Sequence, residues 1–196
     1  MDITIENAFM VLKKYLEHTN MDKFEHSIRV AQTSKILAQK WNVPVEDAII
    51  AGLLHDIGKC MNRREMLNFC TRNNITMYDF EIFANLLALH GKISSLLFER
   101  EFNNNDTKRL KSISHAISNH VAGNETMNLL DKIIFIADNI EPNRRNPILS
   151  DIQSGKLVTP DECIKIIIKH KIKVSNEKTR EPNPFLKATL DSLDER

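Results

Sequence analysis

Polar side chains stand at the ends of two apolar runs in this sequence, where they are unexpected. His55 and Asp56 directly follow the run Ala48–Leu54. Asp138 closes a second run, Ile133–Ala137. Because an aspartate is seldom fully buried unless it is paired or bound to a metal, these positions indicate a site for polar chemistry inside the protein.

Three more histidines share a helical stripe with apolar residues, so we expect their side chains to point inward. His26 shares its stripe with Val30 and Leu37. His90 shares its stripe with Phe83, Leu86 and Leu87. His120 shares its stripe with Leu110, Ile113 and Ile117. His115 lies about 140° around the helix from His120 and is expected on a different face. His18 and His170 have charged neighbours, and we expect both on the surface.

The six inward side chains indicate metal chemistry when they are considered together. A single inward histidine is usually a hydrogen-bonded core residue, and a single aspartate at a helix end is usually a cap. Burial of all six without a cation would leave several polar groups unsatisfied, at a cost of roughly 1–3 kcal/mol each. Imidazole and carboxylate without thiolate favour iron, manganese or another borderline metal over a structural zinc.

Other familiar sites are absent from the sequence. The five glycines, at positions 52, 58, 91, 123 and 155, form neither a GxGxxG nor a Walker A loop. No histidine follows a glutamate by three residues, which excludes the ExxH pairs of ferritin-like di-iron bundles, and HExxH and GxSxG are also missing. Cys60, Cys70 and Cys163 match no disulfide or zinc spacing, so we expect reduced, structural thiols.

Composition narrows the class of protein further. The 27 Lys and Arg against 26 Asp and Glu give a net charge of +1, without the basic footprint of a duplex-DNA-binding protein. No apolar run is long enough to cross a bilayer, and Met1-Asp2-Ile3 is not the basic start of a secretion signal. We therefore expect a soluble, cytoplasmic protein that binds neither a membrane nor a nucleic-acid duplex. A chain of 196 residues can bury roughly 70% of its unfolded surface, so a metal would serve chemistry and not folding.

The apolar period is helical along almost the whole chain, and no alternating stretch with a hairpin turn predicts a sheet. The first expected helix carries the apolar stripe Phe9, Leu12 and Leu16, and the second runs from an Asp22 cap to about Lys40. Pro44 opens the third helix and Gly58 stops it. Further helices are expected at about 63–72, 78–90, 92–101, 107–121 and 127–140. The capping box Thr159-Pro160-Asp161-Glu162 and the pair Asn183-Pro184 open two more. The predicted fold class is all-α, a single domain over 1–196 with a bundle at about 5–140 and a C-terminal helical appendage at about 159–194.

The order His26, His55-Asp56, Asp138 resembles the H…HD…D signature of HD-domain metal-dependent phosphohydrolases, and His90 and His120 resemble the extra histidines of members with two metals. The surrounding residues are similar to one bacterial family, the YqeK-like symmetrical dinucleoside tetraphosphatases. The similar stretches are Phe24-Glu25-His26, Gly52–Lys59, Leu89-His90-Gly91, Asn119-His120, Leu130–Ile134 and Ala137–Pro142. The sequence departs from that family at Lys92–Ser95 and after about residue 170.

The resemblance implies an HD-type domain with a metal-binding core at about 20–145 and two divalent metal ions. One metal would be held by His26, His55, Asp56 and Asp138, and the other by Asp56, His90 and His120. A bridging carboxylate can hold two cations about 3.5–4 Å apart, which lets them share a nucleophilic hydroxide. The implied reaction is symmetrical hydrolysis of diadenosine tetraphosphate, or a related dinucleoside polyphosphate, to two ADP.

Basic residues near the ligands are candidates for phosphate contacts. Lys59 lies one turn beyond Asp56, and Arg29 is three residues past His26. We expect both to join Asp56 in catalysis and to bind substrate. Arg144 and Arg145 are further candidates, for distal phosphates. For Arg29 and these two arginines, an ordinary exposed position explains the residue equally well.

Three other functions remain open on the sequence alone. Another HD phosphohydrolase, acting on a mononucleotide or cyclic nucleotide, would keep every ligand and differ in its pocket. A di-iron oxygenase would react with oxygen, and a non-catalytic nucleotide sensor or scaffold would bind without turnover. The sequence also allows a homodimer.

Overall fold

The computed structural model describes residues 1–102, 106–144, 150–154, 156, 159–178 and 181–195. It confirms the all-α fold class, because these residues contain no strand. The α-helices are α1 (Ile5–Leu12), α2 (Met21–Lys40), α3 (Val45–Leu54), α4 (Arg63–Arg72), α5 (His90–Glu101), α6 (Thr107–Asn119), α7 (Leu129–Ile140), α8 (Ser150–Gln153), α9 (Pro160–Glu177) and α10 (Pro184–Asp194). The other helical segments are the π-helical η1 (Lys13–Glu17) and η3 (Phe80–Ala84) and the 3-10-helical η2 (Ile57–Cys60) and η4 (Leu86–Leu89).

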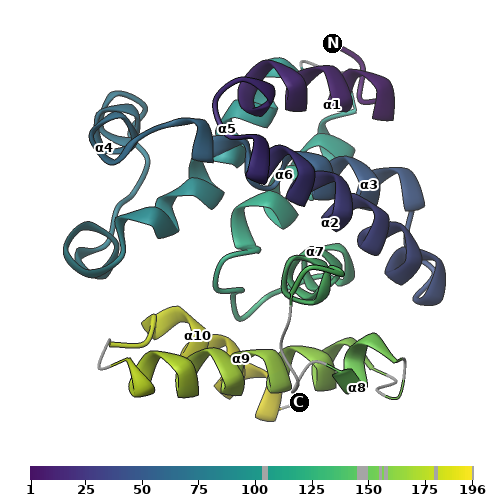
Figure 1. Cartoon of the computed structure of the whole chain (residues 1–196), viewed down its shortest axis with the longest axis vertical. Helices are drawn as coiled ribbons and strands as arrows, with labels where there is room; N and C mark the ends of the chain where they lie inside the picture. The colour runs from purple at the N-terminus through teal and green to yellow at the C-terminus, as the bar shows by residue number, and fades with distance from the viewer. Residues whose placement is uncertain (103–105, 145–149, 155, 157–158, 179–180, 196) are drawn as a thin grey trace.

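Helix α7 lies in the middle of the molecule (Figure 1). Helices α2, α3 and α6 pack against it, and α9 packs against it from the layer that α8, α9 and α10 form at the bottom of Figure 1. The run Ile133–Ala137 is fully buried, as expected for a helix that is covered on several sides. The single-domain organisation of the chain stays a prediction. Within the described residues, no helix combines the length and the apolar character of a membrane span.

Side-chain caps begin α4, α7, α9 and α10. Asn62, Asn128 and Thr159 each form a capping box with the acidic residue three positions later. Asn183 caps α10, with Pro184 at its first position. The predictions for the last two helices are therefore confirmed. The three cysteines are free thiols, also as predicted.

Three details of the first helices differ from prediction. Asn20, not Asp22, caps α2: the Asn20 side chain accepts a hydrogen bond from the backbone N–H of Lys23 in the first turn. Pro44 is the N-cap residue and not the first helical residue of α3. Phe9 is 37% exposed, at the edge of the buried face of α1, where its ring lies 6.0 Å from that of Phe24.

The position at which α3 ends also differs from the prediction, and this difference affects the site. The helix ends at Leu54, so Gly58 does not stop it and lies instead in the 3-10 turn η2. The Gly58 N–H donates a hydrogen bond to Ser94 Oγ at 2.8 Å, and a Cβ on Gly58 would lie 2.7 Å from the His90 carbonyl oxygen. A glycine is therefore required for this close approach between η2 and α5.

The prediction of one continuous helix at 78–90 is wrong. The chain forms η3 and η4 there, and the non-helical backbone of Asn85, with φ −146° and ψ 66°, separates them. Phe83 and Leu87 are 81% and 54% exposed, so the stripe assigned to His90 is not a core stripe. His90 instead begins α5, where it is buried together with Ile93 one turn later.

Candidate metal centre

Asp56 lies at the centre of the predicted ligand cluster. Its side chain is fully buried in the turn between α3 and η2, where φ is −106° and ψ is 6°. This backbone conformation directs the carboxylate between histidines of four other positions. The two carboxylate oxygens face two different groups of ligands.

The first group surrounds Asp56 Oδ2. The Nε2 atoms of His55 and His26 lie 3.5 Å and 3.8 Å from that oxygen. Asp138 Oδ1, at the end of α7, is 2.9 Å from His26 Nε2 and 3.8 Å from His55 Nε2. The ligand atoms of His26, His55 and Asp56 all lie within 4.8 Å of one another, a spacing that suits one shared metal ion.

The second group surrounds Asp56 Oδ1. His90 Nε2, at the start of α5, lies 3.1 Å from this oxygen, and His120 Nε2, directly after α6, lies 3.5 Å from it. The two Nε2 atoms are 2.9 Å apart. Asp56, His90 and His120 form a second set whose ligand atoms lie within 4.8 Å of one another. The structure thus brings all six predicted ligands together, with one oxygen of Asp56 facing each set.

The outer ring nitrogen of each histidine is held in place. In His55, His90 and His120, Nδ1 donates a hydrogen bond to the backbone carbonyl three residues earlier. In His26, Nδ1 donates to Glu141 Oε1 at 3.2 Å. A proton on Nδ1 leaves the lone pair on Nε2, the atom that points inward in all four rings.

Electrostatics favours the metal-binding protonation states of His55, His90, Asp56 and Asp138. Burial lowers the pKa of His55 to about 3 and that of His90 to about 4, so both imidazoles are neutral near pH 7. Burial opposes ionisation of Asp56 and Asp138, but their basic neighbours outweigh it and hold both pKa values well below the usual range. Neutral imidazole and ionised carboxylate are the forms that bind a divalent cation.

Two buried ligand atoms show that the cluster fits a metal. His55 Nε2 and Asp56 Oδ1 have no hydrogen-bond partner among the described residues. An unsatisfied buried polar atom costs about 1–3 kcal/mol. A divalent cation coordinated by both sets would satisfy these atoms, and the nitrogen and oxygen donors include no thiolate.

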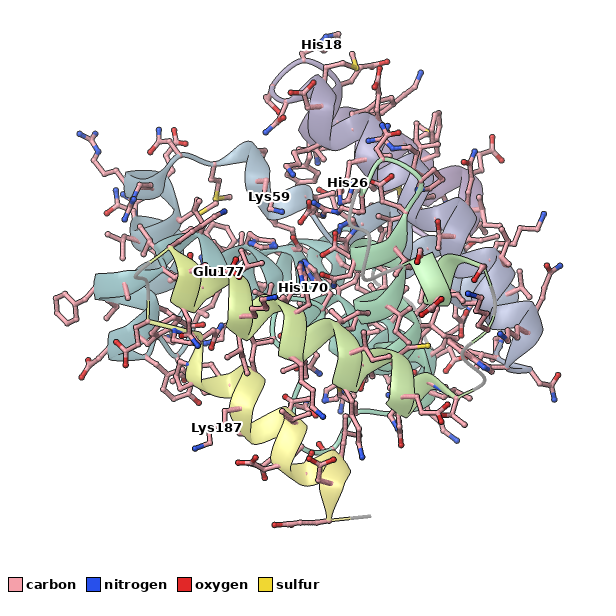
Figure 2. All side chains as sticks on the ribbon, turned by 60° about the horizontal axis from the view of Figure 1, so that its bottom comes forward. His18, His26, Lys59, His170, Glu177 and Lys187 are labelled. Carbon is pink, nitrogen blue, oxygen red and sulfur yellow. The ribbon has the colours of Figure 1, made fainter. Side chains whose placement is uncertain are left out.

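The predicted basic residues occupy different positions around the ligands. Lys59 Nζ lies 2.7 Å from Asp56 Oδ2, and Arg144 Nη2 lies 2.7 Å from Asp138 Oδ1. Arg29 pairs instead with Glu141, at 2.8 Å from Nε to Oε2. Figure 2 shows Lys59 in the same part of the molecule as His26. Arg145 lies outside the described residues.

Glu141 was not predicted as a site residue, although it directly follows the apolar helix α7. It is 2% exposed and lies between two basic partners, His26 and Arg29. Burial would raise its pKa, but the Asn143 N–H, Arg29 and His26 together lower it. An ionised Glu141 therefore orients the His26 ring from outside the ligand set.

Two lysines near the site were also missed. Lys23, one turn before His26 on α2, lines a cavity of about 410 Å³ together with Lys59, His90 and Val121. Lys171, on α9, donates a hydrogen bond to the carbonyl of Val121 at 3.3 Å. No signal in the sequence distinguishes Lys171 from the other lysines of α9.

The Lys171 ammonium is partly buried on α9. Its Nζ lies 4.8 Å from the centroid of the Phe135 ring, and no carboxylate of the described residues forms an ion pair with it. Burial lowers its pKa to about 8, against the attraction of Asp138. The ammonium is thus placed beside the metal centre by a helix of the C-terminal layer.

The remaining histidines lie outside both ligand sets. The His115 side chain is 44% exposed, and its Nδ1 is 2.8 Å from Asp131 Oδ2, as expected from its position on another face of α6. His18 is exposed at the edge of the molecule in Figure 2. His170, predicted on the surface, is only partly exposed on α9.

The fold and the ligand order define an HD-domain protein, and residues 24–143 match the family model of the HD domain. The chain is 32% identical to the symmetrical bis(5'-nucleosyl)-tetraphosphatase of Staphylococcus aureus over 77% of this chain and 73% of that one, and 30% identical to the Bacillus subtilis protein of the same name over 76% and 75%. A crystal structure of a predicted HD superfamily hydrolase involved in NAD metabolism from Clostridium acetobutylicum superposes with a TM-score of 0.85, at 26% identity over 97% of both chains. The chain therefore belongs to the HD-domain family, in the branch of the symmetrical bis(5'-nucleosyl)-tetraphosphatases.

Proposed function

We propose that the protein hydrolyses diadenosine tetraphosphate, or a related dinucleoside polyphosphate, symmetrically to two ADP. The observation that carries the proposal is the buried Asp56 carboxylate, which turns one oxygen to His26 and His55 and the other to His90 and His120. The names of the relatives in this branch supply the substrate class. Two divalent ions are proposed, with iron favoured and manganese as the alternative.

When bound, a metal pair supplies a nucleophile derived from water and neutralises charge on the phosphoryl oxygens. Three ammonium or guanidinium groups, those of Lys59, Arg144 and Lys171, lie beside the ligands and can bind the polyphosphate. Lys23 adds a fourth cation at the cavity wall. The substrate must be cut at a central phosphorus, since only that cut leaves two diphosphates.

Arg29, unlike Lys59 and Arg144, does not contact a ligand candidate directly among the contacts described above. Its ion pair with Glu141 supports a positioning role, exerted through Glu141 on the His26 ring. Its direct contact with phosphate stays a prediction, as do the contact of Arg145, the cytoplasmic location and the homodimer.

Product analysis in oxygen-18 water tests the proposal. The metal-loaded protein is incubated with diadenosine tetraphosphate, and the products are separated and weighed by mass spectrometry. We expect two ADP molecules, one of which carries a single labelled oxygen on its terminal phosphate. AMP and ATP as products would contradict symmetrical cleavage, and faster turnover of a mononucleotide or cyclic nucleotide would contradict the substrate. Chelation should abolish turnover, and ferrous iron or manganese should restore it.

A further inference from the structure

A second cavity, of about 200 Å³, adjoins the cavity beside the metal centre. The two cavities share Ala88 and Val121 as lining residues. Ala88 precedes His90 by two residues, and Val121 directly follows His120. The segments that carry the second ligand set therefore also form the boundary between the two cavities.

Two aromatic rings line the second cavity. Tyr78 and Phe185 have ring centroids 5.0 Å apart and planes inclined at 57°. Tyr78 is 49% exposed, so its ring is not occupied by core packing. Accessible aromatic rings are surfaces on which nucleobases stack, because every base has a π-face.

The Tyr78 ring is held by a partly buried ion pair. Lys92 Nζ lies 4.5 Å from the ring centroid and 2.7 Å from Glu81 Oε2, and Glu81 is only 3% exposed. The same Glu81 oxygen accepts the Tyr78 N–H at 2.9 Å, and Lys92 Nζ donates to the Thr76 carbonyl at 2.9 Å. This network fixes an exposed aromatic side chain beside the cavity.

The Phe185 ring is held by the docking of α10. Thr189 Oγ1 donates to the Ala122 carbonyl at 3.0 Å. Gly123 has a φ of +73°, and a Cβ there would lie 2.8 Å from Thr189 Cγ2, so the backbone and the helix are in close contact. The amide side chains of Asn119 and Asn124 line the same cavity and offer donors and acceptors to the edge of a base.

We propose that this second cavity binds the nucleobase of one ADP unit of the substrate. Tyr78 and Phe185 supply the stacking surface, while the diphosphate of that unit extends past Ala88 and Val121 to the metal centre. The inference rests on the proposed function for the identity of the ligand. It assigns a role in recognition to α10, which carries none of the metal ligands.

Titration calorimetry on the manganese-loaded protein tests the inference, with ADP and inorganic diphosphate as the two probes. Tyr78→Ala and Phe185→Ala should each weaken ADP binding about 10-fold, by the loss of one stacking surface. Diphosphate binding should not change, because it uses only the metals and the cations. Phe83→Ala is the matched control, since Phe83 is 81% exposed and lines neither cavity.

Two results would overturn the inference: unchanged ADP affinity in both variants, or equal weakening of ADP and diphosphate. Tyr78→Phe, which keeps the ring, should restore ADP affinity and thereby separates stacking from a folding defect. The outcome is independent of turnover. If the wild-type protein fails to hydrolyse diadenosine tetraphosphate, the proposed function fails, whereas a selective loss of ADP binding still supports the base cavity.

Discussion

The metal ligands and the residues around the two cavities are positioned in different ways. Each ligand histidine lies at a buried helix position or helix end, and a nearby carbonyl or carboxylate fixes its ring. The cavities take Tyr78 from a segment before η3 and Phe185 from the C-terminal layer. The same layer places Lys171 against the carbonyl of Val121, a residue that lines both cavities. The candidate metal centre thus depends on the inward faces of its helices, whereas the proposed substrate recognition depends on how distant segments pack together.

The largest effect is expected at the residue that both ligand sets share. Asp56→Ala should remove a ligand from both metals and lower turnover by at least about 10³-fold, because no other carboxylate of the described residues faces both groups. Metal content and steady-state kinetics measure the effect, and circular dichroism should show an intact helical fold. Asp56→Asn keeps the shape without the charge and should fail similarly. Two bound metals with normal turnover in either variant would refute the bridging role.

A smaller loss is expected when the support of one ligand is removed. Glu141→Ala should weaken metal binding at the His26 set about 10–100-fold, because the His26 ring loses its acceptor at Nδ1. Glu141→Gln should recover part of the affinity, since its amide oxygen can accept the same hydrogen bond. Metal titration measures both variants. Glu25→Gln, which changes the 64% exposed partner of Arg29, is the control and should bind metal normally.

Substitution on α9 tests the proposed substrate-recognition side of the comparison. Lys171→Met should raise KM about 10-fold without lowering metal content, because a phosphate loses one charge-assisted hydrogen bond while the ligands are untouched. Lys173→Met, two residues away on the same helix, should leave KM unchanged because the Lys173 side chain is 71% exposed. Steady-state kinetics with diadenosine tetraphosphate decides the matter. An equal effect of both substitutions would show that α9 acts only through general surface charge.

The smallest effect separates two histidines of one helix. His115→Ala should leave metal content and turnover unchanged and lower stability by about 1 kcal/mol, because the buried Asp131 loses a hydrogen-bond partner. His120→Ala should instead lose the second metal. Thermal unfolding and metal analysis distinguish the two effects. Loss of metal in the His115 variant would show that the face of α6 with His115, and not the face with His120, points to the metal site.

The inward positions of the ligand candidates could be predicted because helical periodicity determines which side chains point inward. His26, His120 and Asp138 lie where their apolar neighbours indicated. His90 was assigned inward from the stripe of Phe83 and Leu87, yet both of these are exposed, and the position of His90 follows from α5 instead. The inward position of His90 was thus predicted from an incorrect helix.

The contacts of Lys171 and Phe185 could not be predicted from local sequence pattern. Lys171 is separated from His120 by 51 positions in the sequence, and its contact with Val121 exists only because α9 packs on α7. Phe185 reaches Tyr78 through the docking of α10. Glu141, by contrast, could have been predicted locally, because a carboxylate directly after a buried helix is the same kind of signal that identified Asp138.

The contact between Gly58 and α5 determines what would be needed to transplant this metal site into another helical protein. The turn that carries Asp56 is joined to Ser94 by a hydrogen bond, and it approaches the His90 carbonyl so closely that no side chain fits at position 58. A design that copied only the four histidines and two aspartates would lack this contact, and Asp56 and His90 would be free to move apart. The smallest portable unit therefore includes a glycine and a serine that bind no metal.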